Sequence, residues 1–234
     1  MTSLPDLAAF TASANRLPPR HLGTRHDRKG NFLPEPGNTV VCHLVDGSPS
    51  RDAIVEARRA LMELPGAERL AFTPVSSLHM TLFQGVIEFR RRLPYWPDDV
   101  PLNAPIEEVT ALYLARLDGF SPGAHFRMRV TGITPEGLAL EGVADNDRRA
   151  LAQWRDRLAA CFGYRHPDHD DYRFHITFAY LMEWLEDDAA GAWRDGMAQI
   201  LARLRAEAPV IELAPPAFCT FEDMRHFEEI KPIV

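Results

Sequence analysis

Short apolar runs alternate along this chain with segments rich in proline, glycine and charge. Apolar runs with many β-branched residues are typical of strands, whereas apolar positions spaced three and four apart indicate helices. Strands are predicted over residues 39–45, 78–87, 125–133, 138–143 and 173–181, with one or two more within 209–221. Helices are predicted over residues 4–15, 50–63, 104–117, 145–162 and 186–206. Ser50 and Asp145 are the expected N-caps of two of these helices.

The predicted elements repeat in order. One strand–helix–strand unit covers residues 40–45, 51–64 and 78–86, and a second covers 138–143, 147–162 and 174–181. Each unit has the length of a common supersecondary motif. The sequence therefore predicts an internal duplication.

The same short motif lies in the last strand of both units. The first copy is His79-Met80-Thr81 and the second is His175-Ile176-Thr177. Successive side chains of a strand point to opposite faces, so each histidine shares a face with the threonine two residues later. If the two units meet about a pseudo-two-fold axis, two imidazoles and two hydroxyls line one cleft.

This set of side chains suits the cleavage of a phosphodiester. One histidine can accept a proton from the attacking group while the other donates a proton to the leaving oxygen. The threonine hydroxyls can donate hydrogen bonds to the phosphoryl oxygens. The chemistry requires no metal, and the sequence leaves open which histidine is the base.

The phrases FLPEPGNTVVCHL, SLHMTLFQGV and YRFHITFAY resemble the two-histidine (2H) phosphoesterase superfamily, and within it a branch known only as a domain of unknown function. The resemblance spans about residues 23–221. It implies an α+β, internally duplicated, two-lobed fold, with mainly antiparallel sheets lining a central cleft and helices outside. The superfamily includes RNA 2′,3′-cyclic phosphodiesterases, RNA-ligase-like proteins and 2′,5′-oligoadenylate phosphodiesterases.

The resemblance also implies roles for the motif residues. His79 and His175 would form the catalytic pair, and Thr81 and Thr177 would bind the substrate phosphate. Several members of the superfamily carry an arginine shortly after the second motif, where this chain has Tyr180. A phosphate or base contact at that place is therefore not implied.

Four further residues are candidates for substrate contact. Arg173 lies two positions before His175, so strand alternation predicts that it faces the cleft and contacts the phosphate. Ser77 occupies the matching position in the first motif. His43 lies in the predicted strand 39–45 and Tyr180 near the end of the predicted strand 173–181, and each could instead serve a structural role in the core. The Gly/Pro-rich segment 25–38 could cover the cleft or wrap the surface.

The loop before the second motif invites a different interpretation. It is dense in potential metal ligands, which are His166, Asp168, His169, Asp170, Asp171 and His175. Such ligands suit a transition metal, but their crowding around a proline is typical of a solvated loop. We expect no metal and no cofactor.

Composition narrows the choice of partner. The 234 residues carry a formal charge of −7, which disfavours a long nucleic acid and leaves a small nucleotide or a short oligonucleotide with a phosphodiester. The three cysteines, Cys42, Cys161 and Cys219, form no pair motif and suggest reduced thiols. With neither an apolar span nor a secretory leader in view, we expect a cytoplasmic monomer without membrane contact.

The chain is expected to comprise an N-terminal helix and wrapping segment over residues 1–38, followed by a single two-lobed domain over 39–234. The leading hypothesis is a metal-independent phosphodiesterase that opens a 2′,3′-cyclic phosphate or cleaves a 2′,5′ linkage by histidine acid–base catalysis. Two alternatives are a non-catalytic module that binds nucleotides or RNA ends and, less favoured, a metal-dependent hydrolase.

Overall fold

The computed structural model describes residues 6–234, and within this range the strands form one seven-stranded and one two-stranded sheet. The strands are β1 (Gly37–His43), β2 (Leu70–Phe72), β3 (His79–Ile87), β4 (Met128–Thr134), β5 (Gly137–Gly142), β6 (His175–Thr177), β7 (Ala179–Leu181), β8 (Ala217–Phe221) and β9 (Glu228–Pro232). The α-helices are α1 (Pro49–Met62), α2 (Ile106–Leu117), α3 (Asp145–Phe162) and α4 (Ala190–Glu207). None of the described helices is long and apolar enough to cross a bilayer.

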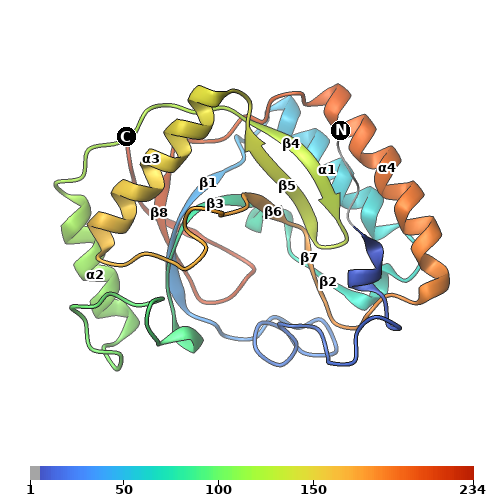
Figure 1. The fold of residues 1–234 in the computed structure, drawn as a ribbon, viewed down its shortest axis with the longest axis horizontal. Coiled ribbons are helices and arrows are strands. Elements are labelled where there is room, and N and C mark those ends of the chain that lie inside the picture. The colour runs from blue at the N-terminus through green and yellow to red at the C-terminus, as the bar shows by residue number, and fades with distance from the viewer. Residues whose placement is uncertain (1–5) are drawn as a thin grey trace.

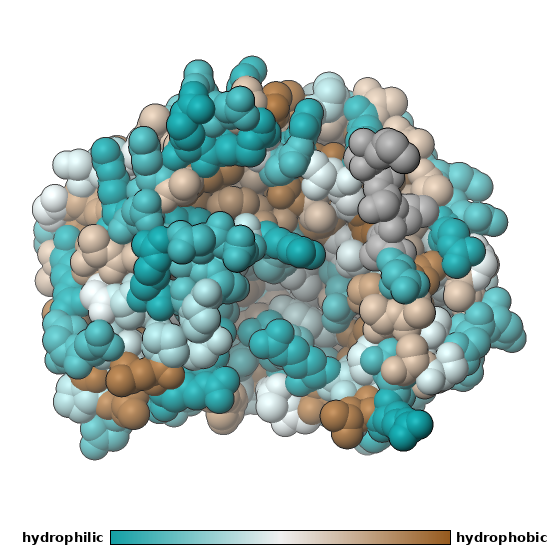
Figure 2. Space-filling model, viewed as in Figure 1, coloured by the Kyte–Doolittle hydropathy of each residue, from teal (hydrophilic) through white to brown (hydrophobic). Residues whose placement is uncertain are grey.

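The large sheet has the order β4-β5-β6-β3-β1-β8-β9, with antiparallel neighbours throughout. Helices α2 and α3 lie on one side of the molecule and α1 and α4 on the other (Figure 1). The space-filling view from the same direction is hollowed near its centre, with hydrophilic residues on the rim (Figure 2). The α+β fold with two lobes around a central hollow is therefore as predicted.

The predicted duplication is confirmed by the strand order. The first unit is β1–α1–β3 and the second is β5–α3–β6. In each unit the outer strand pairs with the inner one, and the two inner strands, β3 and β6, pair with each other. The pseudo-two-fold axis therefore passes between β3 and β6, where Met80 lies opposite Ile176.

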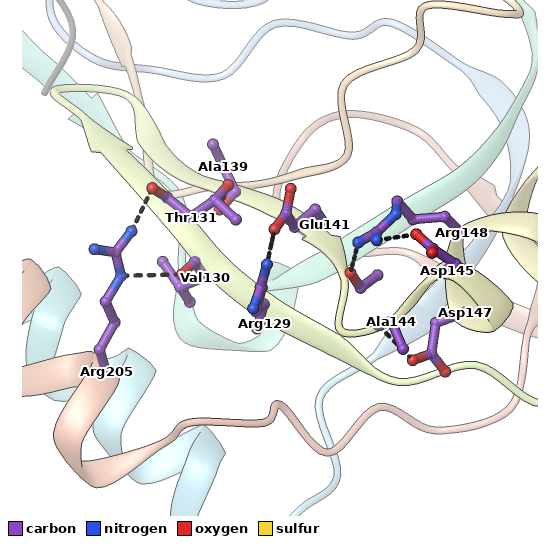
Figure 3. Close-up of polar contacts among 11 residues, drawn as sticks. Arg129, Val130, Thr131, Ala139, Glu141, Ala144, Asp145, Asp147, Arg148 and Arg205 are labelled. Carbon is purple, nitrogen blue, oxygen red and sulfur yellow. Dashed lines mark hydrogen bonds and ion pairs between the residues drawn. The ribbon is translucent and has the colours of Figure 1, made fainter. Parts of the chain in front are cut away.

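Both predicted N-cap residues are wrong, because each lies one or two positions after the observed N-cap. Helix α1 is capped by Ser48, whose hydroxyl accepts a backbone N–H of the first turn, because Pro49 occupies the first helical position. The hydroxyl of Ser50 instead accepts a hydrogen bond from a distant loop. Asp145 begins α3 without capping it, and the carboxylate of Asp147 accepts the N–H of Ala144 just before the helix (Figure 3).

The predicted strand 173–181 is two strands in two sheets. β6 ends at Thr177, the N–H of Phe178 donates to the carbonyl of Glu136 rather than to a strand neighbour, and β7 pairs with β2. The alternation of faces that starts at His175 therefore does not continue to Tyr180. Sequence reasoning also missed the short strands β2 and β9. Strand β9 lies at the edge of the large sheet and carries charged side chains, which are common on edge strands because they hinder pairing with another chain.

The N-terminal segment differs from its prediction. Only Leu7–Phe10 forms a helical turn, of the 3-10 type, and residues 4 and 5 of the predicted helix 4–15 lie outside the described range. The following chain runs along one edge of the molecule, below the sheet in Figure 1. A tight turn forms there, with Gly30 at a φ of 80° and the Asp27 carboxylate accepting backbone N–H groups of the turn.

Candidate active site

The two motifs meet at the centre of the large sheet. Because Met80 faces Ile176 across an antiparallel pair, His79 lies next to the threonine of the second motif, and His175 next to the threonine of the first. Met80 and Ile176 are fully buried on the core side. The histidines and threonines therefore share the opposite face, and all four line one cavity of about 270 Å³, here called the histidine cavity.

Both imidazoles are held in the same way. The Nδ1 atom of His79 lies 2.7 Å from the carbonyl oxygen of Ser77, and the Nδ1 atom of His175 lies 2.9 Å from that of Arg173. A carbonyl can only accept, so each Nδ1 carries a proton and donates it. In the neutral ring, Nε2 is then the free acceptor, which is the form that a general base needs.

The surroundings of the two rings differ. His79 is half-buried, with the ring of Phe227 at 4.0 Å between centroids and that of His43 at 6.3 Å. Burial lowers the pKa of His79 to about 3, and the nearby His43 and His175 contribute to this. His175 is exposed to solvent. His79 is therefore neutral at physiological pH, while the ring of its partner is open to solvent.

Aromatic and cationic groups support the threonine side of the cavity. Tyr172 lines the cavity, and its hydroxyl interacts with Thr81. Its ring lies 3.9 Å from the guanidinium carbon of Arg155, which donates a 2.8 Å hydrogen bond to the carbonyl of Leu82. Burial raises the pKa of Tyr172 to about 12. The phenol therefore stays protonated and can orient Thr81.

The structure places two other predicted contact residues, Ser77 and Arg173, at different cavities. Ser77 lines the histidine cavity from the turn before β3, where its hydroxyl donates to the carbonyl of Met224 at 2.6 Å. Arg173 precedes β6, so strand alternation does not apply to it. Its exposed side chain lines a second cavity of about 410 Å³, which adjoins the first and shares His175 with it. Arg173 therefore lies beside His175 and Thr177, and its contact with the phosphate stays a prediction.

His43 and Tyr180 also lie near the pair. His43 pairs with His79 across β1 and β3, and its Nε2 lies 3.7 Å from the thiol of Cys219, but it is not among the residues that line the histidine cavity. Tyr180 is buried and lines both cavities, and its hydroxyl accepts a 3.4 Å hydrogen bond from Arg25. Arg25 thus brings a guanidinium next to the phenol of Tyr180.

Sequence reasoning missed the contribution of the N-terminal segment. Arg20, His21 and Arg25 line both cavities, and the ring of His21 lies 5.5 Å from that of Tyr180. Burial, Arg25 and Arg20 lower the pKa of His21 to about 3. The proline and glycine content marked residues 25–38 as a segment that could cover the cleft or wrap the surface. Arg20 and His21 precede that segment, and no motif marked any of these three residues. Tyr172, Phe227 and Arg90 were missed for the same reason.

Three side chains of the loop rich in potential metal ligands are bound to groups outside the histidine pair. His166 lies 2.8 Å from the carbonyl of Gln84, and His169 lies 3.0 Å from the carboxylate of Asp156. Asp170 accepts a hydrogen bond from an arginine at 2.5 Å. Across residues 6–234, no group of three or more His, Cys, Asp or Glu side chains is arranged to hold a metal ion.

The chain is similar to proteins of known structure. None of the curated proteins matches the chain. The conserved protein of unknown function ATU0111 from Agrobacterium tumefaciens is 51% identical, with a TM-score of 0.96 over 97% of this chain and 98% of that one. A structure described as a phosphoesterase is 14% identical, with a TM-score of 0.46 over 85% of this chain and 97% of that one, a similarity too small to establish a shared activity.

The family model for 2H phosphodiesterases, described as a domain of unknown function (DUF1868), matches residues 25–139. The match includes β1 and the first His-x-Thr motif, while the second motif lies beyond it. The duplicated sheet supplies that second motif at the pseudo-symmetric position. Residues 25–139 of the chain therefore belong to the 2H phosphoesterase family, in a branch of unknown function.

Proposed function

We propose that this protein is a metal-independent phosphodiesterase that acts on a nucleotide-type substrate, either a 2′,3′-cyclic phosphate or a 2′,5′ linkage. Family membership supports phosphoesterase activity in general. The observation that carries the finer proposal is the pair of Nδ1-anchored histidines, which share one cavity with two threonines. The aromatic rings of Tyr172 and Phe227 on the same cavity offer surfaces for a base or ribose.

The asymmetry of the pair suggests the direction of proton transfer. In the opening of a cyclic phosphate, water attacks phosphorus and its proton passes to Nε2 of neutral His79. The bond from phosphorus to one ribose oxygen breaks, and the protonated form of His175 donates its Nε2 proton to that oxygen. His175 then regains a proton from solvent, and His79 releases one. Thr81 and Thr177 donate hydrogen bonds to the non-bridging oxygens as charge develops on them.

The test is turnover by single variants. His79→Ala and His175→Ala should each lower kcat/KM by about 10³-fold or more on the substrate that the protein cleaves, because each removes one proton-transfer group. The substrates are 2′,3′-cyclic mononucleotides and short 2′,5′ oligomers, with products identified by chromatography and mass spectrometry. His125→Ala is the matched control, since His125 is exposed and outside the histidine cavity.

Wild-type rates in both single variants would overturn the proposal. Saturable binding of these nucleotides by the wild-type protein, with no product formed, would instead identify a binding module.

A further inference from the structure

The histidine cavity continues along β3 away from the catalytic pair. Register shifts in the pairing of β1 with β3 change which side chains of β3 face the cavity. Gln84 and Ile87 line the cavity beyond Thr81, whereas Phe83 is fully buried in the core. The chain then enters a 3-10 turn, Glu88–Arg90, and Arg90 lines the cavity at this end.

Arg90 carries donors without acceptors. Its Nε and Nη2 atoms are buried and have no hydrogen-bond partner among the described residues. Its guanidinium lies over the ring of Tyr95, with 4.4 Å between the guanidinium carbon and the ring centroid. The adjacent Arg91, by contrast, is bound to the carboxylate of Glu88 at 2.9 and 2.5 Å. Buried charged donors that lack an acceptor cost free energy, which a bound anion would recover.

Other cations lie on the same cavity. Arg20 and Arg25 line it together with Arg90, and Arg25 is close enough to lower the pKa of Arg90, an effect that adds to that of burial. Arg25 is partly neutralised by Glu35 at 2.7 Å. Among the residues that line the cavity, Asp168 is the one carboxylate. A chain with a net charge of −7 thus concentrates positive charge at this place.

We infer that the Arg90 end of the histidine cavity binds a second anionic group of the substrate. Building on the proposed function, this specifies a nucleotide whose cyclic or 2′,5′-linked phosphate sits between the histidines and whose further phosphate, such as a 5′-phosphate, sits against Arg90. The planar guanidinium, already held by Tyr95, can donate two parallel hydrogen bonds to that group. Cyclic mononucleotides that lack this further phosphate would then bind less tightly.

The test measures binding, so it does not depend on turnover. Isothermal titration gives the dissociation constants of adenosine 2′- and 3′-phosphate and of the matching 2′,5′- and 3′,5′-bisphosphates. In the wild-type protein, we expect the bisphosphate to bind about 30-fold more tightly than the monophosphate, because charge-assisted hydrogen bonds to the second phosphate are gained. Arg90→Met should reduce this preference to less than about 5-fold, and Arg90→Lys should give an intermediate value.

The control is Arg92→Met. Arg92 is exposed and also lies over Tyr95, at 5.5 Å, but does not line the cavity, so this variant should keep the wild-type preference. Equal affinity for mono- and bisphosphates in the wild-type protein, or an unchanged preference in Arg90→Met, would overturn the inference. A preference that depends on Arg90 in a protein without turnover would refute the proposed function and leave this subsite standing. Turnover of the nucleotides without a preference for the bisphosphate would refute this subsite and leave the proposed function standing.

Discussion

The buried position of His79 makes the stability of the folded protein depend on pH. The folded-state pKa is about 3, below the value of 6.5 for the unfolded chain. Below pH 6.5, His79 therefore binds a proton in the unfolded chain but not in the folded protein. The folded state loses stability as pH falls toward 3. The full shift corresponds to about 5 kcal/mol. Because the half-buried ring borders a water-accessible cavity, we expect about 2 kcal/mol between pH 7 and pH 4.

His79→Asn isolates this contribution. The asparagine amide can still donate to the carbonyl of Ser77, but it does not titrate. Urea unfolding followed by tryptophan fluorescence at pH 7 and pH 4 gives the free energy of unfolding of each protein. Wild type should lose about 2 kcal/mol more than His79→Asn over this range, because the other buried histidines affect both proteins equally. His125→Asn, which alters an exposed histidine, should lose as much as wild type.

One outcome of the urea experiment would contradict this reasoning. If His79→Asn and wild type lose the same stability between the two pH values, His79 is not held neutral by the fold. The assignment of His79 as the proton acceptor would then have no electrostatic basis.

Two further substitutions test the surroundings of the site. Phe227→Ala opens His79 to water, so the pKa of His79 should rise toward 6.5 and the acidic limb of kcat/KM should move to higher pH; a profile identical to that of wild type would contradict the role given to Phe227. Gly137→Ala should cost more than about 2 kcal/mol in urea unfolding, since Gly137 has a φ of 146° and a Cβ there would overlap the carbonyl oxygen of Ile176. The matched Gly132→Ala places its Cβ 3.6 Å from a neighbouring side chain and should be nearly neutral, so equal effects of the two substitutions would refute the steric argument.

The parts of the fold that sequence predicts well are those with strong local periodicity. The strand around Met80 and the helix Asp145–Phe162 follow from alternation and helical spacing alone. The repeated His-x-Thr motif placed both histidines on one face because alternation holds within each short strand. These predictions depend on contacts between near neighbours in the chain, which a sequence displays directly.

The predictions that are wrong depend on interactions with distant parts of the chain. Alternation could not foresee that the backbone leaves the sheet at Phe178, because that break is made by the carbonyl of Glu136. It could not foresee Arg25 beside Tyr180, since 155 residues separate the two. Arg90 lies in a segment whose arginines look alike in sequence. Only the fold distinguishes the one with buried, unpaired donors.

The two motif histidines have the same hydrogen bond to the backbone but different neighbouring side chains. This difference arises because the repeated unit includes the hydrogen-bond partner but not those neighbours. The carbonyl two residues before each histidine belongs to the repeated unit, so both rings keep the same Nδ1 hydrogen bond. Phe227 lies between β8 and β9, outside the repeat, and its ring packs against that of His79. A symmetric pair of histidines would have equal proton affinities, and neither would be preferred as base. Elements added around the repeat therefore give the two rings different surroundings.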